Sequence, residues 1–179
     1  MTIDAICDHT AVNPDAEVHQ HFTDLLNGSD TLLYGRITYL LMQSYWPALV
    51  KNPSGNKMED DFANAIDNIN KIVFSRTLSE NDPVITGWRN TQLKKEIVRD
   101  EMLALKQQSG GDILAGSPSL IITLLNLKLV DELQLMVHPT ISGKGQPLFK
   151  NISAQIELRL LKTKTFRSGA VNFYFEPTT

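Results

Sequence analysis

The sequence has little cysteine, no long apolar run and no excess of positive charge. Cys7 is the only cysteine among 179 residues, so neither an intrachain disulfide nor a cysteine-rich zinc site can form. No apolar stretch approaches the ~18 residues of a membrane-spanning helix. The net charge of −3 argues against a broad surface for nucleic acid or for an anionic membrane. We expect a cytoplasmic protein, since neither a secretory signal nor a disulfide framework is apparent.

Several familiar catalytic signatures are also missing. The dinucleotide fingerprint G-x-G-x-x-G, the P-loop pattern and the nucleophile elbow G-x-S-x-G are absent. His19 and His21 stand two residues apart on an expected helix, so their side chains point to different sides and would not chelate one metal together. We therefore expect no metal site and no nucleophilic hydrolase.

The remaining composition is that of an ordinary globular protein. Hydrophobic residues make up 42% of the chain and charged residues 21%. One domain covering residues 1–179 is expected, because domains usually hold roughly 100–200 residues. A chain of this length can bury most of its apolar surface in one core.

Short apolar runs alternate with helical patterns up to about residue 138. The expected helices cover residues 14–26, 37–43, 59–69, 94–108 and 118–127, the first of them capped by Asn13 and Pro14. The expected strands cover residues 31–34, 71–74, 84–91, 112–115 and 131–137, and residues 47–57 are expected to form a surface loop. This alternation predicts a largely parallel sheet covered by helices.

The chain ends in two alternating runs. One face of the first run carries Ile156, Leu158 and Leu160, and one face of the second carries Val171, Phe173 and Phe175. A turn at Ser168-Gly169 would join the runs into a hairpin and add an antiparallel edge to the sheet. The expected fold class is therefore α/β, with a mixed, mostly parallel sheet and a C-terminal antiparallel hairpin.

Three of the expected strands end in small, hydroxyl-bearing or cationic residues. They run into Gly35-Arg36-Ile37-Thr38, Ser75-Arg76-Thr77 and Gly116-Ser117-Pro118-Ser119. In an open α/β sheet the carboxyl ends of neighbouring strands line one crevice, and ligands bind there. Hydroxyls, two arginines and a helix start at one edge predict a site for a phosphate-rich ligand.

Each feature also has a simpler interpretation. Ser117-Pro118 would start a helix well without any bound anion, and a single arginine on a turn is commonly just exposed. Two arginines at adjacent strand ends nevertheless favour a dianion such as a ribose 2′-phosphate, the group by which an arginine distinguishes NADP from NAD. No acidic residue stands at these two strand ends to bind an unphosphorylated ribose.

The order and spacing of these segments resemble the dihydrofolate reductase superfamily. The segments are Leu33–Tyr39, Ile72–Thr77 and Asp112–Leu120. Two further stretches, from Leu129-Val130-Asp131-Glu132 to His138-Pro139 and over Gly143–Phe149, are more specific. They resemble the C-terminal reductase domain of the bifunctional riboflavin-biosynthesis deaminase/reductase and its stand-alone bacterial relatives.

The resemblance implies a three-layer fold, in which helices flank a mixed sheet of about eight strands. It also implies NADPH as hydride donor and a homodimer. Gly35, Arg36 and Thr38 would meet the adenosine-side phosphates, and Ser75, Arg76 and Thr77 would hold the 2′-phosphate end. The pyrophosphate would lie against Gly116, Ser117, Ser119 and Leu120.

The chain departs from its relatives near the N-terminus. Thr2-Ile3-Asp4-Ala5 stands where they carry Ser-x-Asp-Gly after a complete first strand, so Ala5 replaces a glycine and most of that strand is expected to be missing. The carboxylate that protonates the pterin in dihydrofolate reductases aligns near His19. Asp4 and His19 are therefore the candidate catalytic residues, and Tyr45 and Trp46 are weaker candidates for substrate contact.

These observations favour an NADPH-dependent reductase of the riboflavin-biosynthesis type, acting on a small polar heterocycle. The reference reaction of the family reduces the ribose of 5-amino-6-(5-phosphoribosylamino)uracil to ribitol. The zinc-deaminase signature H-x-E with P-C-x-x-C is absent, so only the reductase half is represented. A non-catalytic NADP-binding module and a reductase of pterins, dihydrofolate or xenobiotics remain as alternatives.

Overall fold

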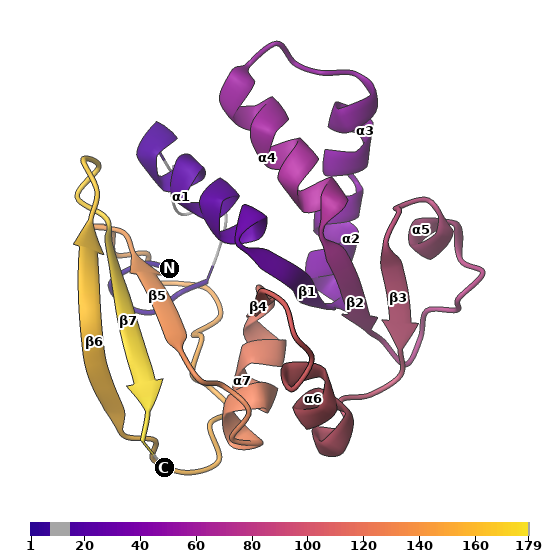
Figure 1. Cartoon of the computed structure of the whole chain (residues 1–179). Coiled ribbons are helices and arrows are strands. Elements are labelled where there is room, and N and C mark those ends of the chain that lie inside the picture. The colour runs from indigo at the N-terminus through magenta and orange to yellow at the C-terminus, as the bar shows by residue number, and fades with distance from the viewer. Residues whose placement is uncertain (8–14, 179) are drawn as a thin grey trace. The chain divides into compact units, whose positions relative to one another are not determined.

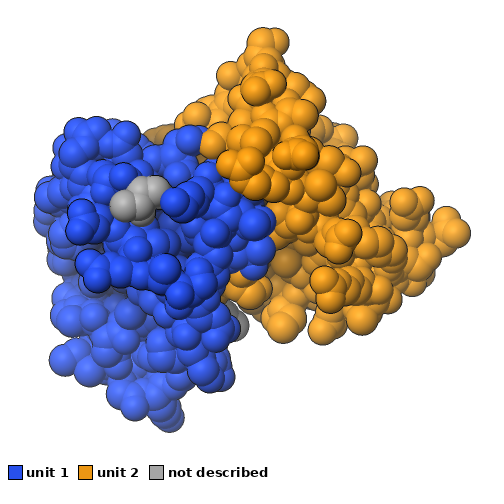
Figure 2. All heavy atoms as spheres, turned by 90° about the horizontal axis from the view of Figure 1, so that it is seen from below, with its two compact units in different colours: residues 1–18, 121–179 blue, residues 19–120 orange. Residues whose placement is uncertain are grey.

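The computed structural model describes residues 1–7 and 15–178 (Figure 1). The expected helix cap at Asn13 and Pro14 lies outside these residues. The chain forms two compact units, which Figure 2 shows in different colours. One unit is His19–Leu120, and the other combines Met1–Val18 with Ile121–Thr179.

The unit His19–Leu120 is built on a four-stranded parallel sheet. Its strands are β1 (Ser29–Gly35), β2 (Asn70–Phe74), β3 (Thr91–Lys94) and β4 (Asp112–Ala115). Their order in the sheet is β3-β2-β1-β4, and all three pairings are parallel. Because all strands run the same way, their carboxyl ends lie along one edge of this sheet (Figure 1).

The described residues form seven helices, of which α1 precedes the first strand and the others connect strands. They are α1 (Ala16–Asn27), α2 (Arg36–Gln43), α3 (Trp46–Lys51), α4 (Lys57–Asn68), α5 (Pro83–Thr86), α6 (Arg99–Lys106) and α7 (Pro118–Asn126). The core of the unit is aromatic, because Tyr39 of α2 stacks on Trp88 with ring centroids 5.5 Å apart. Both side chains are almost completely buried, and the Tyr39 hydroxyl donates to the Val84 carbonyl over 2.6 Å. These contacts fix α2, and thus the residues that open it, against the sheet.

The other unit contains a three-stranded antiparallel sheet. Its strands are β5 (Leu133–Val137), β6 (Leu158–Thr165) and β7 (Val171–Pro177), in the order β5-β7-β6. The turn between β6 and β7 has Gly169 at φ +82°, a left-handed conformation that glycine adopts freely. The α/β class and the C-terminal hairpin predicted from the sequence are confirmed.

The single mixed sheet of about eight strands is not observed. Among the described residues, seven strands form two separate sheets. The expected apolar face of the first C-terminal run is covered only in part. Ile156 is half-buried against the core, whereas every residue of β6 is exposed, with Leu160 52% accessible. β6 is the outer strand of its sheet, and the lysines along it are typical of an edge that resists pairing with another chain.

Three local predictions were wrong. Residues 47–57 were expected to form a loop, but α3 occupies Trp46–Lys51, with the buried Pro47 in its first turn, where proline is tolerated. The strand expected at 84–91 is replaced by α5, which starts at Pro83 and ends at Gly87. The helix expected from Lys94 begins at Arg99, because residues 91–94 form β3.

Gly87 shows why α5 ends where it does. A Cβ at this position would lie 2.5 Å from the Pro83 carbonyl oxygen, closer than real Cβ atoms approach. Asp82 and Pro83 open the helix and Gly87 closes it, so start and stop signals override the strand preference of Val84, Ile85 and Thr86.

Candidate cofactor site at the strand ends

The register of the parallel sheet brings the predicted strand-end segments to one edge. Gly35 at the end of β1 lies opposite Phe74 at the end of β2. Leu33 of β1 lies opposite Ala115, the last residue of β4. Ser75-Arg76-Thr77 and Gly116-Ser117 therefore continue from neighbouring positions on either side of β1.

Ser117 joins two of these segments. Its Oγ accepts a hydrogen bond from the Gly35 N–H over 2.8 Å, and the residue is only 1% exposed. The hydroxyl thus holds the end of β1 beside the start of α7, and the Gly35 N–H is already engaged. We infer that Ser117 holds the two strand-end segments together, and the exposed Ser119 lies next to Gly35.

A Cβ could be added at Gly35 or Gly116 without a clash. Gly35 has an ordinary backbone (φ −82°, ψ 157°), and an added Cβ would make only normal contacts at 3.6–3.7 Å with Ser117 and Ser119. An added Cβ at Gly116 would meet nothing nearer than a Tyr34 ring carbon at 3.9 Å. The fold itself does not require glycine at either position. Close approach of a ligand to the protein backbone would require it.

The start of α2 is suited to an anion. Gly35 is the N-cap and supplies no side-chain hydrogen bond, and the first turn contains no acidic residue. The exposed N–H groups and the helix dipole favour negative charge at such a position. Arg36 is exposed and forms no hydrogen bond or ion pair with a described residue, and Thr38 is half-buried one turn into the helix.

The segment after β2 is a tight turn organised by Ser75. The buried Ser75 Oγ accepts from the N–H groups of Thr77 (3.3 Å) and Leu78 (3.1 Å). Its oxygen also lies 3.3 Å from the Thr77 hydroxyl. Arg76 is exposed at the tip and has no charged partner among the described residues. The turn therefore presents the guanidinium of Arg76 and the hydroxyl of Thr77.

Leu120 differs from the other expected cofactor contacts. Its side chain is 4% exposed and belongs to the protein interior. Any contact with a ligand would have to come from its main chain in the first turn of α7. Pro118 opens that helix, as the sequence predicted.

Asp4 is braced by its own surroundings in the other unit. Its carboxylate accepts from the Thr2 hydroxyl (2.6 Å), the Gly143 N–H (2.8 Å) and the Ser142 N–H (3.1 Å). These hydrogen bonds, the Thr2 hydroxyl foremost, lower the pKa of Asp4 to about 2. The carboxylate stays ionised at neutral pH, so Asp4 can accept a hydrogen bond from a substrate but cannot donate a proton to it.

His19, Trp46 and Tyr45 are brought into one aromatic group. The His19 ring on α1 meets Phe62 edge-on, with centroids 6.4 Å apart, and Trp46 packs on the same Phe62 at 4.5 Å. The Trp46 indole N–H points to the Met42 sulfur, which marks Trp46 as a packing residue. Tyr45 meets Trp46 edge-on and is 49% exposed, so Tyr45 is the member available to a ligand.

Lys95 is a residue that the sequence reasoning missed. It follows directly on β3, which pairs with β2 so that Lys94 lies opposite Phe74. The sequence pattern predicted a strand at 84–91 and a helix from Lys94. Lys95 was therefore expected on a helix, away from the strand ends. The Lys-Lys pair after Gln92-Leu93 was the available signal for a fourth strand end.

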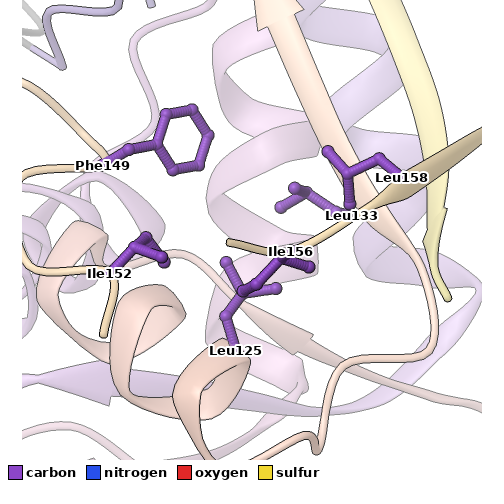
Figure 3. Close-up of a pocket in the computed structure, with 6 residues that line it drawn as sticks. All are labelled: Leu125, Leu133, Phe149, Ile152, Ile156 and Leu158. Atoms are coloured by element: carbon purple, nitrogen blue, oxygen red, sulfur yellow. The ribbon is translucent and has the colours of Figure 1, made fainter. Parts of the chain in front are cut away.

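An apolar pocket of about 250 Å³ lies elsewhere, in the unit with the antiparallel sheet (Figure 3). It is lined by Leu125, Leu133, Phe149, Ile152, Ile156 and Leu158. None of these side chains can bind an anion or transfer a proton. The pocket is therefore not a candidate for the chemistry of this protein.

Neither a metal-binding cluster nor a membrane-spanning helix occurs among the described residues. In residues 1–7 and 15–178, no group of three or more His, Cys, Asp or Glu side chains is placed to hold a metal ion. Within the same ranges, every helix is too short or too polar to cross a membrane.

Comparison with known proteins gives one matching family and several similar chains. The family model described as RibD C-terminal domain matches residues 2–172. The chain is 38% identical over 155 residues to the Uncharacterized protein YyaP of Bacillus subtilis (strain 168). This alignment covers 86% of the chain and 77% of YyaP.

Solved structures are similar in fold at low sequence identity. A protein of Shewanella sp. PV-4 named for riboflavin biosynthesis matches with a TM-score of 0.71 at 18% identity, covering 99% of this chain and 95% of the other. RibD of Acinetobacter baumannii matches with a TM-score of 0.69 at 13% identity. That match covers 99% of this chain but only 56% of RibD, so the chain corresponds to just over half of the longer protein.

Proposed function

Because the chain belongs to the RibD C-terminal domain family, whose members are reductase-like, we propose that it is an NADPH-dependent reductase. Its substrate would be a small polar heterocycle or the ribosyl derivative of one. The reference reaction of the family, reduction of the ribose of 5-amino-6-(5-phosphoribosylamino)uracil, is the first candidate. The small-molecule site and the absence of a basic excess fit a cytoplasmic enzyme that binds no nucleic acid.

The observation that carries the proposal is the pair Arg36 and Arg76. Both are exposed at the ends of neighbouring parallel strands, and neither is neutralised by a described carboxylate. Exposed cations with no partner, beside a free helix start and two open glycines, fit a ligand that carries several phosphates. NADPH has a pyrophosphate and a 2′-phosphate.

The protein's own residues would bind and orient this cofactor, which supplies the hydride. Gly35, Gly116 and Ser119 would admit the pyrophosphate to the helix starts, with Ser117 holding the two segments together. Arg36 and Thr38 would meet the adenosine-side phosphates. Arg76 and Thr77 would bind the 2′-phosphate from the turn that Ser75 organises.

We keep His19 of the unit His19–Leu120 as a candidate proton donor, and we separately keep Asp4 of the other unit as a candidate hydrogen-bond acceptor. The Asp4 carboxylate, whose pKa is lowered by its hydrogen bonds, is ionised and cannot itself be the proton donor. Tyr45 would contribute an exposed ring for a planar substrate. The carboxylate used by pterin reductases has no counterpart here, which favours a substrate other than dihydrofolate.

One observation favours a non-catalytic NADP-binding module as second candidate. Asp4 accepts one hydrogen bond from Thr2 in its own turn and two from the segment Ser142-Gly143, and Ala5 replaces the glycine expected beside it. A residue so engaged could serve structure alone. Slow, substrate-independent oxidation of NADPH across a panel of uracil, pterin and carbonyl compounds would favour this candidate.

We extend the proposal to a homodimer, as the family resemblance implies. Apolar side chains are exposed on the outer strand β6, among them Leu158, Leu160 and Leu161. Phe173 and Phe175 of the neighbouring β7 are only partly covered. Such a surface fits contact between two copies better than contact with water.

The function is tested with a double substitution, Arg36→Ala with Arg76→Ala. We expect NADPH binding, followed by fluorescence titration, to weaken far more than NADH binding. Each lost charged contact should cost roughly 1.5–3 kcal/mol. The control is Arg167→Ala, which removes an exposed arginine from the other unit.

The outcomes separate clearly. Equal weakening for NADPH and NADH would contradict the assignment of Arg76 to the 2′-phosphate. If the unaltered protein binds neither nucleotide, the reductase proposal itself fails. Selective loss of NADPH binding would support it and justify a substrate screen that starts with the riboflavin intermediate.

A further inference from the structure

We propose that Lys95 is a second cation of the 2′-phosphate site, beside Arg76, and a determinant of the preference for NADPH over NADH. The inference rests on the proposed function and adds β3 to the strand ends that form the site. It names a residue to which neither the sequence motifs nor the family resemblance assigned a role.

The sheet register places Lys95 beside the turn that follows β2. Phe74 and Lys94 are opposite each other at the ends of β2 and β3. The Ser75 N–H donates to the Lys94 carbonyl over 2.9 Å, which continues the pairing by one residue. Lys95 therefore follows β3 directly, next to the Ser75-Arg76 segment that follows β2.

The side chain of Lys95 reaches over this turn. Its Nζ donates to the carbonyl of Leu78, the residue that closes the turn, over 2.5 Å. The Leu78 N–H is in turn bound to the Ser75 Oγ over 3.1 Å. The ammonium is thus held near Arg76 and Thr77 while remaining exposed to solvent.

The turn offers few backbone donors to an anion. The N–H groups of Thr77 and Leu78 are both satisfied by the Ser75 Oγ. A phosphate at this place must therefore be bound mainly by side chains. Arg76 and Thr77 supply one guanidinium and one hydroxyl, and a dianion needs further positive charge.

Of the two lysines at the end of β3, Lys95 is the one whose positive charge is not paired with a described carboxylate, so we assign the additional charge to it. Its neighbour Lys94 forms an ion pair with Glu101 of α6 and is only partly exposed. Lys95 has no carboxylate partner among the described residues, and its only hydrogen bond there goes to a neutral carbonyl. Exchanging that carbonyl for a phosphate oxygen keeps the hydrogen bond and adds the attraction of opposite charges.

This arrangement acts on the 2′-phosphate alone. NADH carries a hydroxyl at the same position, and an ammonium gains little from exchanging a carbonyl for a hydroxyl. Lys95 should therefore alter the ratio of the two affinities, whereas groups at the pyrophosphate should alter both affinities together.

The test uses Lys95→Gln, with Lys51→Gln on α3 as the matched control for loss of one exposed lysine. NADPH and NADH are titrated by fluorescence, and adenosine 2′-monophosphate and adenosine 5′-monophosphate are titrated as competitors. We expect Lys95→Gln to weaken NADPH and the 2′-monophosphate by about tenfold, as for loss of one charged contact. NADH and the 5′-monophosphate should be nearly unchanged, and Lys95→Arg should restore most of the NADPH affinity.

Each result decides something. If the unaltered protein prefers NADPH and Lys95→Gln keeps the whole preference, the role of Lys95 is overturned while the proposed function stands. The role is also overturned if Lys51→Gln weakens NADPH equally, because a general charge effect would then explain the loss. If the unaltered protein binds no nucleotide, the proposed function and this inference fall together, and thermal melting of each variant shows whether it is folded.

Discussion

At the scale of single residues, Ala5 is the clearest departure from ordinary backbone preference. Its φ of 60° lies in the left-handed region, where an L-residue other than glycine costs roughly 1–2 kcal/mol. Its N–H donates to the Thr2 carbonyl over 3.0 Å, and its carbonyl accepts from Leu148 over 2.9 Å. The neighbouring segments therefore impose the conformation. The turn of the family motif is retained although its glycine is not.

Replacing Ala5 by glycine should stabilise the protein. We expect Ala5→Gly to raise the free energy of unfolding by about 0.5–1 kcal/mol, because relief of the left-handed strain exceeds the extra entropy of the unfolded chain. Denaturant titration would measure the change. The control Ala104→Gly lies at an exposed position in α6 and should lower stability by a similar amount. A loss of stability for both variants would show that Ala5 is not strained.

At the scale of elements, the strands β1, β2 and β4 of the parallel sheet were predicted best. The strand at 112–115 agrees with β4 at both ends, and those at 31–34 and 71–74 differ from β1 and β2 by one or two residues. Short β-branched and aliphatic runs bounded by glycine and polar residues leave few alternatives. The same β-branched preference wrongly predicted a strand at Val84–Thr86. Pro83 starts a helix there instead.

The candidate site was predictable only as far as local patterns determine it. The three strand-end segments follow from their spacing, because parallel strands place their carboxyl ends together. The role of Ser117 does not follow, since its partner Gly35 is 82 positions away in the sequence. Lys95 was missed because the strand before it was misplaced. Non-local contacts and element boundaries thus limited the prediction.

The bond between Ser117 and Gly35 can be tested at the element scale. Ser117→Ala would leave the Gly35 N–H without its present partner and remove a link between the ends of β1 and β4. We expect a loss of about 1–3 kcal/mol in the free energy of unfolding. NADPH and NADH binding should weaken together, since both share the pyrophosphate.

The matched control is Ser109→Ala, an exposed hydroxyl after α6, which should change neither quantity. Unchanged stability of the Ser117→Ala protein would contradict the structural role. Weakening of NADPH alone would instead connect Ser117 with the 2′-phosphate.

At the scale of the whole molecule, the strand-end segments all belong to the unit His19–Leu120, so the proposed cofactor contacts depend on the stability of that unit. A buried lysine lies in its core. The Lys71 Nζ donates to the carbonyls of Ile66, Asp67 and Ile69 over 2.8–3.1 Å, at the end of α4. It also lies 4.8 Å from the centre of the Trp88 ring. The lysine satisfies the last turn of α4 and anchors this helix to β2.

Burial makes this lysine a source of pH-dependent stability. Loss of hydration lowers the pKa of Lys71 to about 8, although the nearby Asp67 carboxylate opposes the shift. Its ordinary value is 10.5. Between these values the unfolded chain holds a proton that the folded chain has released. Stability contributed by this group must therefore rise with pH across that window.

The pH dependence of unfolding should consequently change in Lys71→Met. We expect the stability of the unaltered protein, relative to the variant, to increase by roughly 1–2 kcal/mol between about pH 8 and about pH 9.5, at about 1.4 kcal/mol per pH unit. Denaturant titrations at several pH values would measure it, with the exposed Lys57→Met as control. The window ends at the ordinary value of 10.5, above which the unfolded chain has released the proton as well. The raised pKa of Tyr34 lowers stability in alkaline solution equally in both proteins and cancels in the comparison. Parallel pH profiles for the unaltered and Lys71→Met proteins would mean that the amine titrates normally, and would refute its burial in the core.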